Sequence, residues 1–407
     1  MKTIWIINQY ASTPDVGMGG RHYYLANELA KLGYRVYVIA SASSHLLREQ
    51  PTFPGAFHVV KVAERFSFLW VKLPKYERSS SKQRALNWFL FAWQLQNLTK
   101  VITEKPDVIL HSSPSLVSFL GAQRLAKKFS ARLVFEVRDI WPLTLVELGG
   151  YSSRHPFIQL MQWIERKAYR DSDRVVSNLR KSVQHMVHHG LDERKFSWIA
   201  NGFSLDEGAQ PAELDFSTLQ EIPENKFIVG YTGTMGVANA LDDLIDAAGK
   251  LTGFLDICFV LIGSGKERAR LKKRVDQENL KNVVFIDPIP KTQVHKVLQF
   301  FDVCYIGWRS ESLYRFGIAA NKIPEYMYSG KPILHGYSGT CDPVSEFGCG
   351  VVVNAEDVQS LVEGVLKLYR LSSDERAIMG GNGCAAALEH YEYGGLASKL
   401  EKVLFDD

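Results

Sequence analysis

The residues best placed to do chemistry lie in one short stretch, from Tyr314 to Pro332, in which small side chains lead into a predicted short helix. Gly317 and its small neighbours let the backbone approach a ligand closely, and Asn321 is a residue type that caps helices. Unpaired N–H groups at the helix start and the Lys322 amine then face one anion, which predicts a phosphate site. Glu325, one turn further on, is placed to accept hydrogen bonds from sugar hydroxyls. The alternative is an ordinary loop and helix before a buried strand.

A second glycine cluster follows the first predicted strand and contains Gly19, Gly20 and Arg21. The glycines permit close backbone approach to a ligand, and the arginine supplies a fixed cation. The spacing is not Gly-x-Gly-x-x-Gly, and the second strand ends at Ala40 and Ser41 without an acidic residue for a ribose, which argues against a dinucleotide site. A flexible connection is the alternative.

Three polar residues stand at predicted strand ends, where the residues of a cleft collect in α/β proteins. Arg138 and Asp139 follow one strand, and Asp139 could accept a proton or bind a hydroxyl; a structural contact between the two is the alternative. His111 ends the preceding strand and could reach the same cleft as a catalytic group, or be satisfied locally.

Two further motifs are short. The turn from Gly263 to Lys266 lies between a strand and a helix and fits either a phosphate-binding loop or a plain tight turn, since the other P-loop residues are missing. Asp171 and Asp173 resemble a metal-binding pair, but acidic residues are common in turns and no further carboxylate or histidine cluster supports an ion. The sequence therefore predicts no metal.

Residues 61–93 combine positive charge with apolar side chains. Between positions 61 and 84 there are seven Lys and Arg residues against two Glu, and aromatic and aliphatic residues are interleaved with them from 66 to 93. This combination is typical of a segment that meets an anionic membrane surface. The alternative is a solvated basic loop beside a buried helix.

Length and composition set the frame for these motifs. A chain of 407 residues is too long for one core and predicts two domains. The formal charge of +4 is too small to argue for nucleic acid, and no nucleic-acid partner is expected. Five cysteines without a Cys-x-x-Cys pair fit reduced thiols in the cytoplasm, and neither an export signal nor an apolar span of about 20 residues is evident.

Apolar runs of strand length alternate with helix-period segments along the whole chain, which predicts α/β architecture with parallel sheets. A polar stretch from 204 to 225 interrupts this alternation, so we expect domains at 1–203 and 204–388, and a helix at 389–407 that could cross back to the first domain. The predicted strands are 3–8, 35–40, 57–62, 108–111, 133–137, 175–177, 196–199, 227–231, 256–262, 283–286, 303–306, 332–334 and 350–353. The predicted helices are 20–32, 82–104, 115–129, 156–170, 180–189, 357–370 and 389–406.

Taken together, these motifs resemble the GT-B glycosyltransferases of family 4, and within them the bacterial polysaccharide enzymes that include N-acetylfucosamine transferases. The resemblance covers nearly the whole chain. It rests on Gly19-Gly20-Arg21, on the segments 134–142, 200–202, 230–236 and 261–265, and on the stretch that opens this section.

The resemblance implies two Rossmann-like domains facing across a cleft, a UDP-sugar donor held by the second, an acceptor held by the first, retention of anomeric configuration, and neither metal nor other cofactor. It implies that Glu325 binds the donor ribose. The other donor-site residues that it implies are Gly19, Gly20, Gly233, Thr234, Phe316, Gly317, Ile318, Asn321 and, beside the base within 286–290, Ile289.

The chain departs from the family at three places. The first of two family glutamates corresponds to Gly317, so the sugar must be recognised differently. The Arg and Lys that many members carry after the first strand of the second domain are missing from 234–240, which leaves the charge of the leaving group to Lys322, Arg309 or Arg315, Lys266 and the helix dipole. A histidine that is catalytic in several relatives aligns nearer Ser112 than His111.

These observations predict a sugar transferase on the inner face of the cell membrane, peripherally bound, that uses a polyprenyl-diphosphate-linked sugar as acceptor. Two alternatives remain open. A nucleotide-sugar epimerase of the same two-domain plan would convert the donor without any acceptor. A two-domain sugar-binding protein without catalysis is disfavoured, because neither an export signal nor a DNA-reading helix pair is evident.

Overall fold

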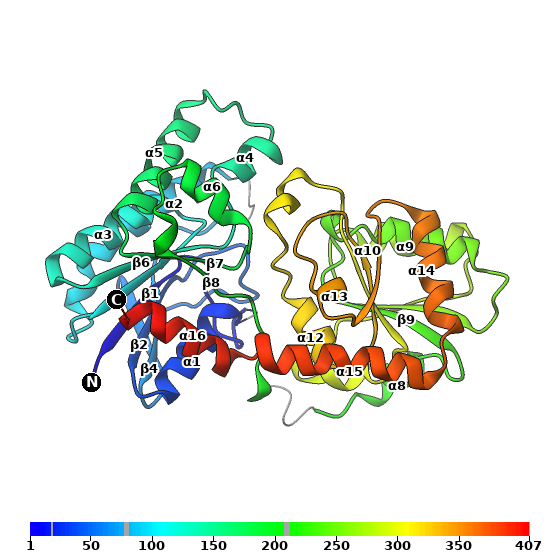
Figure 1. Cartoon of the computed structure of the whole chain (residues 1–407). Helices are drawn as coiled ribbons and strands as arrows, with labels where there is room; N and C mark the ends of the chain where they lie inside the picture. Colours follow the sequence, from blue (N-terminus) through cyan, green and yellow to red (C-terminus); the bar gives the residue numbers. More distant parts are fainter. Residues whose placement is uncertain (18, 77–80, 207–211, 407) are drawn as a thin grey trace. The chain divides into compact units, whose positions relative to one another are not determined.

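The computed structural model describes residues 1–17, 19–76, 81–206 and 212–406 (Figure 1). The chain forms two compact units, one made of Met1–Asn201 together with Tyr393–Asp407 and the other of Gly202–Glu392. Each unit is an α/β layer structure around a mainly parallel sheet, which confirms the predicted fold class of two Rossmann-like domains.

The sheet of the first unit has the strand order β3-β4-β2-β1-β5-β6-β7-β8, and only β3 and β4 pair in antiparallel fashion. Reversal of the strand order between β1 and β5 creates the switch point at which open α/β sheets bind ligands. The strands are β1 (Thr3–Ile7), β2 (Arg35–Ser41), β3 (Phe57–Ala63), β4 (Phe66–Val71), β5 (Val108–Ser112), β6 (Arg132–Val137), β7 (Arg174–Ser177) and β8 (Phe196–Trp198).

Strand β4 was not expected, and it corrects the interpretation of residues 61–93. Phe66, Phe68 and Leu69 are fully buried, and β4 pairs with both β2 and β3. The expectation that the apolar residues of this stretch face a membrane is therefore wrong for β4. A strand that is covered on both faces shows no alternation of apolar and polar residues. Because the continuous apolar run of β4 is flanked by basic residues, its sequence resembles that of a membrane-surface segment.

Helices cover both faces of this sheet. Right-handed crossovers place α1 (Arg21–Lys31) on one face and α2 (Lys82–Gln94), α3 (Val117–Phe129) and α5 (Pro156–Asp171) on the other. The short helices α4 (Leu143–Glu147) and α6 (Ser182–His188) complete the unit. The predicted helix 82–104 ends earlier, as α2 followed by a 3₁₀ turn over Leu95–Lys100.

The carboxyl-terminal helix α16 (Tyr393–Phe405) belongs to the first unit and lies along α1 (Figure 1). Tyr24 stacks on Tyr393 with ring centroids 5.1 Å apart, and Tyr34 stacks on Phe405 at 4.8 Å. The Tyr34 hydroxyl also donates to Glu401 at 2.6 Å. Aromatic stacking at both ends of the helix pair therefore ties the last residues of the chain to its first helix.

The second unit contains a fully parallel sheet of order β11-β10-β9-β12-β13-β14, with its switch point between β9 and β12. Its strands are β9 (Phe227–Thr232), β10 (Ile257–Ile262), β11 (Val283–Ile286), β12 (Val303–Gly307), β13 (Ile333–Gly336) and β14 (Gly350–Val353). Its helices are α8 (Phe216–Glu221), α9 (Leu241–Lys250), α10 (Arg268–Gln277), α11 (Val294–Leu298), α12 (Lys322–Tyr328), α13 (Pro343–Glu346), α14 (Val358–Arg370) and α15 (Ser373–His390).

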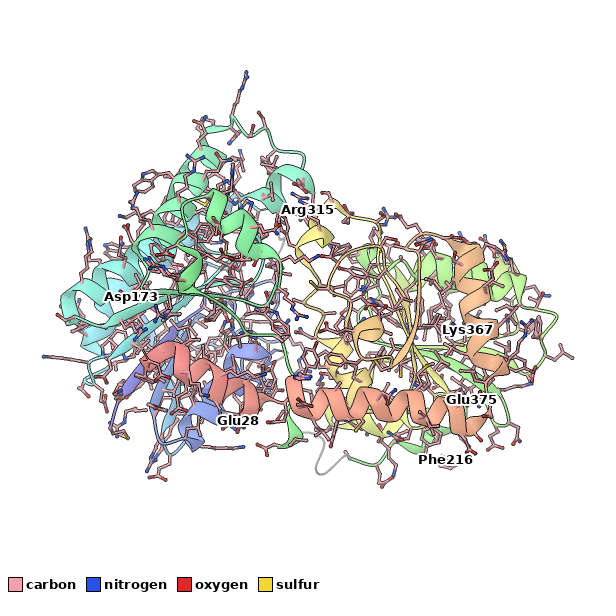
Figure 2. The ribbon with its side chains drawn as sticks, in the orientation of Figure 1. Glu28, Asp173, Phe216, Arg315, Lys367 and Glu375 are labelled. Carbon is pink, nitrogen blue, oxygen red and sulfur yellow. The ribbon has the colours of Figure 1, made fainter. Side chains whose placement is uncertain are left out.

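Helix α15 was missed by the sequence analysis because it contains three glycines. A Cβ at Gly380 would lie 1.9 Å from the carbonyl oxygen of Gly330, so a glycine is required where α15 packs against the turn after α12. The helix starts with a capping box in which the side chains of Ser372 and Glu375 satisfy each other's backbone N–H groups; Glu375 is labelled in Figure 2.

All five cysteines are free thiols, three of them buried. Within the described ranges, no helix has both the length and the apolar character needed to cross a bilayer.

Candidate active site

The predicted anion site lies at the switch point of the second unit, where the loop after β9 meets α12. The Lys322 amine donates a hydrogen bond to the Tyr231 hydroxyl at 2.5 Å and lies 4.0 Å from the centre of the same ring. A Cβ at Gly233 would approach the Lys322 side chain to 2.6 Å, and the Gly233 φ of 128° is one that residues with side chains rarely adopt. Gly233 therefore makes room for the lysine.

Lys322 is tuned by its surroundings. Burial lowers the pKa of its amine to about 7, and the negative charge of Glu325 opposes that shift. Asn239, at the far end of the β9 loop, offers its side-chain oxygen 3.5 Å from the amine. An amine held in this way gains a full charge when an anion arrives beside it, since a nearby negative charge favours the protonated form.

Tyr326 fixes α12 against the end of β9. Its hydroxyl accepts a hydrogen bond from the Thr232 backbone N–H at 2.8 Å and lies 3.2 Å from the Thr232 carbonyl oxygen, to which it donates. The side chain is fully buried, and burial raises the pKa of Tyr326 well above its usual range, so the hydroxyl stays neutral. Tyr326 and Lys322 lie one turn apart, so this anchor positions the lysine over the β9 loop.

Glu325 forms an ion pair with Lys291, which the sequence analysis did not single out. Lys291 begins the 3₁₀ turn directly after the segment expected to border the base, where Ile289 is half-buried. The pair orients the Glu325 carboxylate, whose oxygens can accept hydrogen bonds from hydroxyl groups. Binding of a ribose by Glu325 stays a prediction.

Two glycine turns pack against each other beside this site. A Cβ at Gly263 would lie 2.0 Å from the Gly233 carbonyl oxygen, and a Cβ at Gly265 would lie 2.2 Å from that of Met235. The Thr234 carbonyl accepts hydrogen bonds from the Tyr231 hydroxyl at 2.5 Å and from the Asn239 side chain at 2.9 Å. These contacts explain the glycines of the 263–266 turn by packing, while the Lys266 side chain is exposed.

The last residue of the loop before α12, Asn321, does not make the capping contact that the sequence predicts. Asn321 occupies the N-cap position, but its side chain makes no capping hydrogen bond, so the predicted cap is wrong. Gly317 has φ 98°, and Phe316 is buried with the Arg315 guanidinium 4.3 Å from its ring centre. Ile318 is half-buried, and Arg309 is exposed at the end of β12. Gly317 was singled out in the sequence because it is small. Its positive φ is a second reason for a glycine at this position.

The first unit contains a buried polar network that the sequence analysis missed. Arg21 and Glu136 pair through Nε and Oε1 at 2.7 Å, with both side chains fully buried, and Arg21 also donates to the Ala200 carbonyl. His22 and Ser112 contact the other Glu136 oxygen, each at 2.6 Å. Despite burial, Arg21 and His22 hold the pKa of Glu136 well below its usual range.

This network changes the interpretation of Arg21. Its guanidinium neutralises a buried carboxylate inside the fold, and so differs from the fixed cation for a ligand that the sequence suggested. The neighbouring glycines fit their expected role better, because Gly19 and Gly20 have φ values of 66° and 89° and the space around a Cβ at Gly20 is open.

His111 is a core residue, so its candidacy as a catalytic group is wrong. It is fully buried, bonds to the Ser118 hydroxyl at 2.8 Å, and stacks with Phe135 at 5.9 Å. Burial lowers the pKa of His111 to about 3, which keeps the ring neutral. Ser112 next to it belongs to the Glu136 network and is buried as well.

Arg138 and Asp139 follow β6 as predicted. The Arg138 backbone N–H donates to the Ser113 hydroxyl at 2.9 Å, and the Asp139 residue is exposed. Their roles stay predictions.

Two protein-family models match the chain, Glycosyltransferase Family 4 over residues 17–207 and Glycosyl transferases group 1 over residues 216–384. A curated relative is WcaI of Escherichia coli (strain K12), provisionally described as a colanic acid biosynthesis glycosyl transferase, with 25% identity over 274 residues. The match covers 64% of this chain and 66% of WcaI, slightly less than two thirds of that relative.

Solved structures are similar over almost their full length. Sucrose-phosphate synthase from Thermosynechococcus elongatus is 15% identical with a TM-score of 0.75, covering 99% of this chain and 98% of that one. HepE from Anabaena in complex with UDP is 16% identical with a TM-score of 0.67, covering 99% of each chain. At this level of identity the likeness shows a shared fold.

Proposed function

Because the chain belongs to the GT-B glycosyltransferases, with a family 4 first domain and a group 1 second domain, we propose that it transfers a sugar from a UDP-sugar to a lipid-linked acceptor in bacterial surface polysaccharide synthesis. The reaction retains the anomeric configuration and needs no metal. The assignment of WcaI to colanic acid biosynthesis and the UDP bound to HepE support this proposal.

One observation carries the proposal, the position of Lys322. The β9 loop, where many relatives have an arginine and a lysine, contains neither from Thr234 to Ala240. Lys322 approaches that loop from α12 instead, within 3.5 Å of Asn239. A cation from a different element thus takes the place of the missing ones, in space that the lack of a side chain at Gly233 leaves for it.

The proposed chemistry follows from this arrangement. When the bond between the sugar and the diphosphate breaks, negative charge grows on the leaving phosphate, and a preorganised cation lowers the energy of that state. Lys322 supplies the cation, and Tyr326 holds the helix that carries it. The Glu325 carboxylate, oriented by Lys291, binds the ribose hydroxyls.

The sugar that we propose is an N-acetylated deoxy-sugar such as N-acetylfucosamine. Gly317 replaces the glutamate that would bind sugar hydroxyls in the family, and its φ of 98° disfavours any side chain there. The adjacent Phe316 makes this part of the site less polar. A sugar with fewer hydroxyl groups suits such a surface.

The acceptor that we propose is a polyprenyl-diphosphate-linked sugar, reached from the inner face of the membrane. After the correction for β4, three apolar residues on one face of α2 support contact with lipid: Leu86, Phe89 and Trp93 are 50%, 44% and 64% exposed. Their spacing of three and four residues forms a stripe, and Lys72, Lys75 and Lys82 are exposed in the same segment.

The experiment that tests the proposal begins with thermal shift in the presence of UDP or GDP. UDP is expected to raise the Tm of the protein, and GDP is not. Labelled UDP-N-acetylfucosamine is then incubated with and without a polyprenyl-diphosphate disaccharide, and transfer should require the acceptor. If the sugar nucleotide is converted in the absence of acceptor, the protein is an epimerase. If the UDP-sugar binds but no product forms with or without acceptor, the protein is a sugar-binding protein without catalysis.

A further inference from the structure

A cluster of metal-ligating residues lies in the first unit, on two helices that the proposed transferase chemistry does not use. Glu165 on α5 and the pair His185 and His189, at the end of α6, place one potential ligand atom each within 4.8 Å of the others. In the sequence, only the neighbouring acidic residues Asp171 and Asp173 resemble a metal-binding pair. These three residues are separated along the chain, and folding brings them together.

The two histidines have the spacing that suits a shared ion. Residues four apart lie on the same side of a helix, and the rings of His185 and His189 stack with centroids 4.1 Å apart. The Nε2 atom of His185 lies 2.9 Å from Glu165 Oε1. A tetrahedral zinc ion separates its ligand atoms by about 3.3 Å, so modest rotation of the half-buried rings is sufficient to admit one.

The surroundings prepare these side chains as ligands. Nδ1 of His189 donates to the His185 carbonyl oxygen at 2.8 Å, which leaves the lone pair of the neutral ring on Nε2. A backbone carbonyl in this role is the usual outer partner of a metal-bound histidine.

The carboxylate has an outer partner as well. Tyr169 donates to Glu165 Oε1 at 3.0 Å. This hydrogen bond fixes the orientation of the buried carboxylate.

We propose that Glu165, His185 and His189 bind one divalent transition-metal ion of the zinc class, with water in the remaining position. Two imidazoles and one carboxylate favour zinc over magnesium or calcium, which prefer oxygen ligands only. Glu165 is buried and both histidines are partly exposed, so the ion enters from the solvent side. The ion connects α5 to α6 and stabilises the first unit.

The test uses the untagged full-length protein, freed of metal by chelation and titrated with zinc chloride by calorimetry. We expect one equivalent of zinc to bind to the wild type, and His189→Gln and Glu165→Gln to weaken this binding at least tenfold. His188→Gln is the matched control, since His188 lies on the same helix outside the cluster. Equal zinc binding by wild type and His189→Gln would overturn the proposal.

The visible spectrum of bound cobalt distinguishes this cluster from the free thiols. This measurement can be made on the wild type, so it does not require that the ligand variants fold. Cobalt bound to the wild type should show the visible bands of a four-coordinate nitrogen and oxygen site without thiolate charge-transfer bands, and His188→Gln should keep them. Thiolate bands alone, or no visible bands, would reject the site. Magnesium should not raise the Tm, whereas zinc should. None of these measurements depends on transferase activity.

Discussion

Replacement of Lys322 by methionine keeps the volume of the side chain and removes its charge, and so isolates the role of the cation. A charge-assisted hydrogen bond contributes about 1.5–3 kcal/mol, which predicts a decrease in kcat/KM of roughly 10- to 150-fold if the amine stabilises the leaving diphosphate. Lys331→Met is the matched control, because that amine belongs to the same segment and donates to the Gln299 carbonyl. Its kcat/KM should change less than about twofold.

The pH profile gives the same prediction a second readout. With a pKa of about 7, the Lys322 amine of the free enzyme is charged at pH 6 and mostly neutral at pH 8.5. Because kcat/KM reports the free enzyme, it should fall as pH rises through about 7, approaching about tenfold per unit. In the Lys322→Met variant, kcat/KM should not show this fall with rising pH.

The free energy of unfolding should rise with pH, whereas kcat/KM should fall. The folded state holds the pKa of Lys322 below its unfolded value, so folding disfavours the charged amine below about pH 7, and the free energy of unfolding rises with pH from about 7 towards 10.5. Near pH 7 the variant should therefore be more stable than the wild type, by about 1–3 kcal/mol after the loss of the Tyr231 hydrogen bond. A flat kcat/KM profile, or a variant that is both active and less stable, would refute the reasoning.

Three further predictions address neighbouring features. Tyr326→Phe removes the three hydrogen bonds between the Tyr326 hydroxyl and Thr232 and should lower kcat/KM about 5- to 30-fold at a stability cost of about 1–2 kcal/mol, measured by steady-state kinetics and urea unfolding. Glu325→Ala should raise KM for the donor about tenfold or more and change kcat less, because it removes ribose binding; an unchanged KM would contradict that role. Anionic vesicles should sediment the wild type at low salt, less at high salt, and less again when three α2 residues become serine: Leu86, Phe89 and Trp93. Equal sedimentation of both proteins would exclude α2 as the contact.

The alternation of apolar strands and amphipathic helices was enough to predict the fold class, because buried parallel strands are continuous apolar runs. The failures have specific physical causes. β4 is such a run, but it is embedded among basic residues. α15 contains glycines that intrinsic propensity disfavours, and close packing at Gly380 requires one of them.

The local arrangement around Lys322 was predictable because one short segment contains its main residues, while their roles in binding stay predictions. The stretch around Lys322 has its small residues, cation and carboxylate close together in sequence. Its contact with Gly233, however, depends on the sheet topology.

The buried pair of Arg21 and Glu136 spans 115 residues, and a local pattern cannot reveal which distant carboxylate neutralises an arginine. The same holds for His111, whose burial between aromatic rings comes from tertiary packing.

Calorimetric titration with UDP tests most directly whether Lys322 binds the diphosphate. The titrations are made at pH values above the second pKa of the terminal phosphate, which is near 6, so that the charge of UDP stays constant. Between pH 7 and pH 9 the wild-type Kd should rise at least tenfold, because the free amine has a pKa of about 7 and loses its proton over this range. Lys322→Met should bind UDP weakly and equally at both values. Wild type and variant with the same Kd at pH 7 would contradict a diphosphate site built around Lys322.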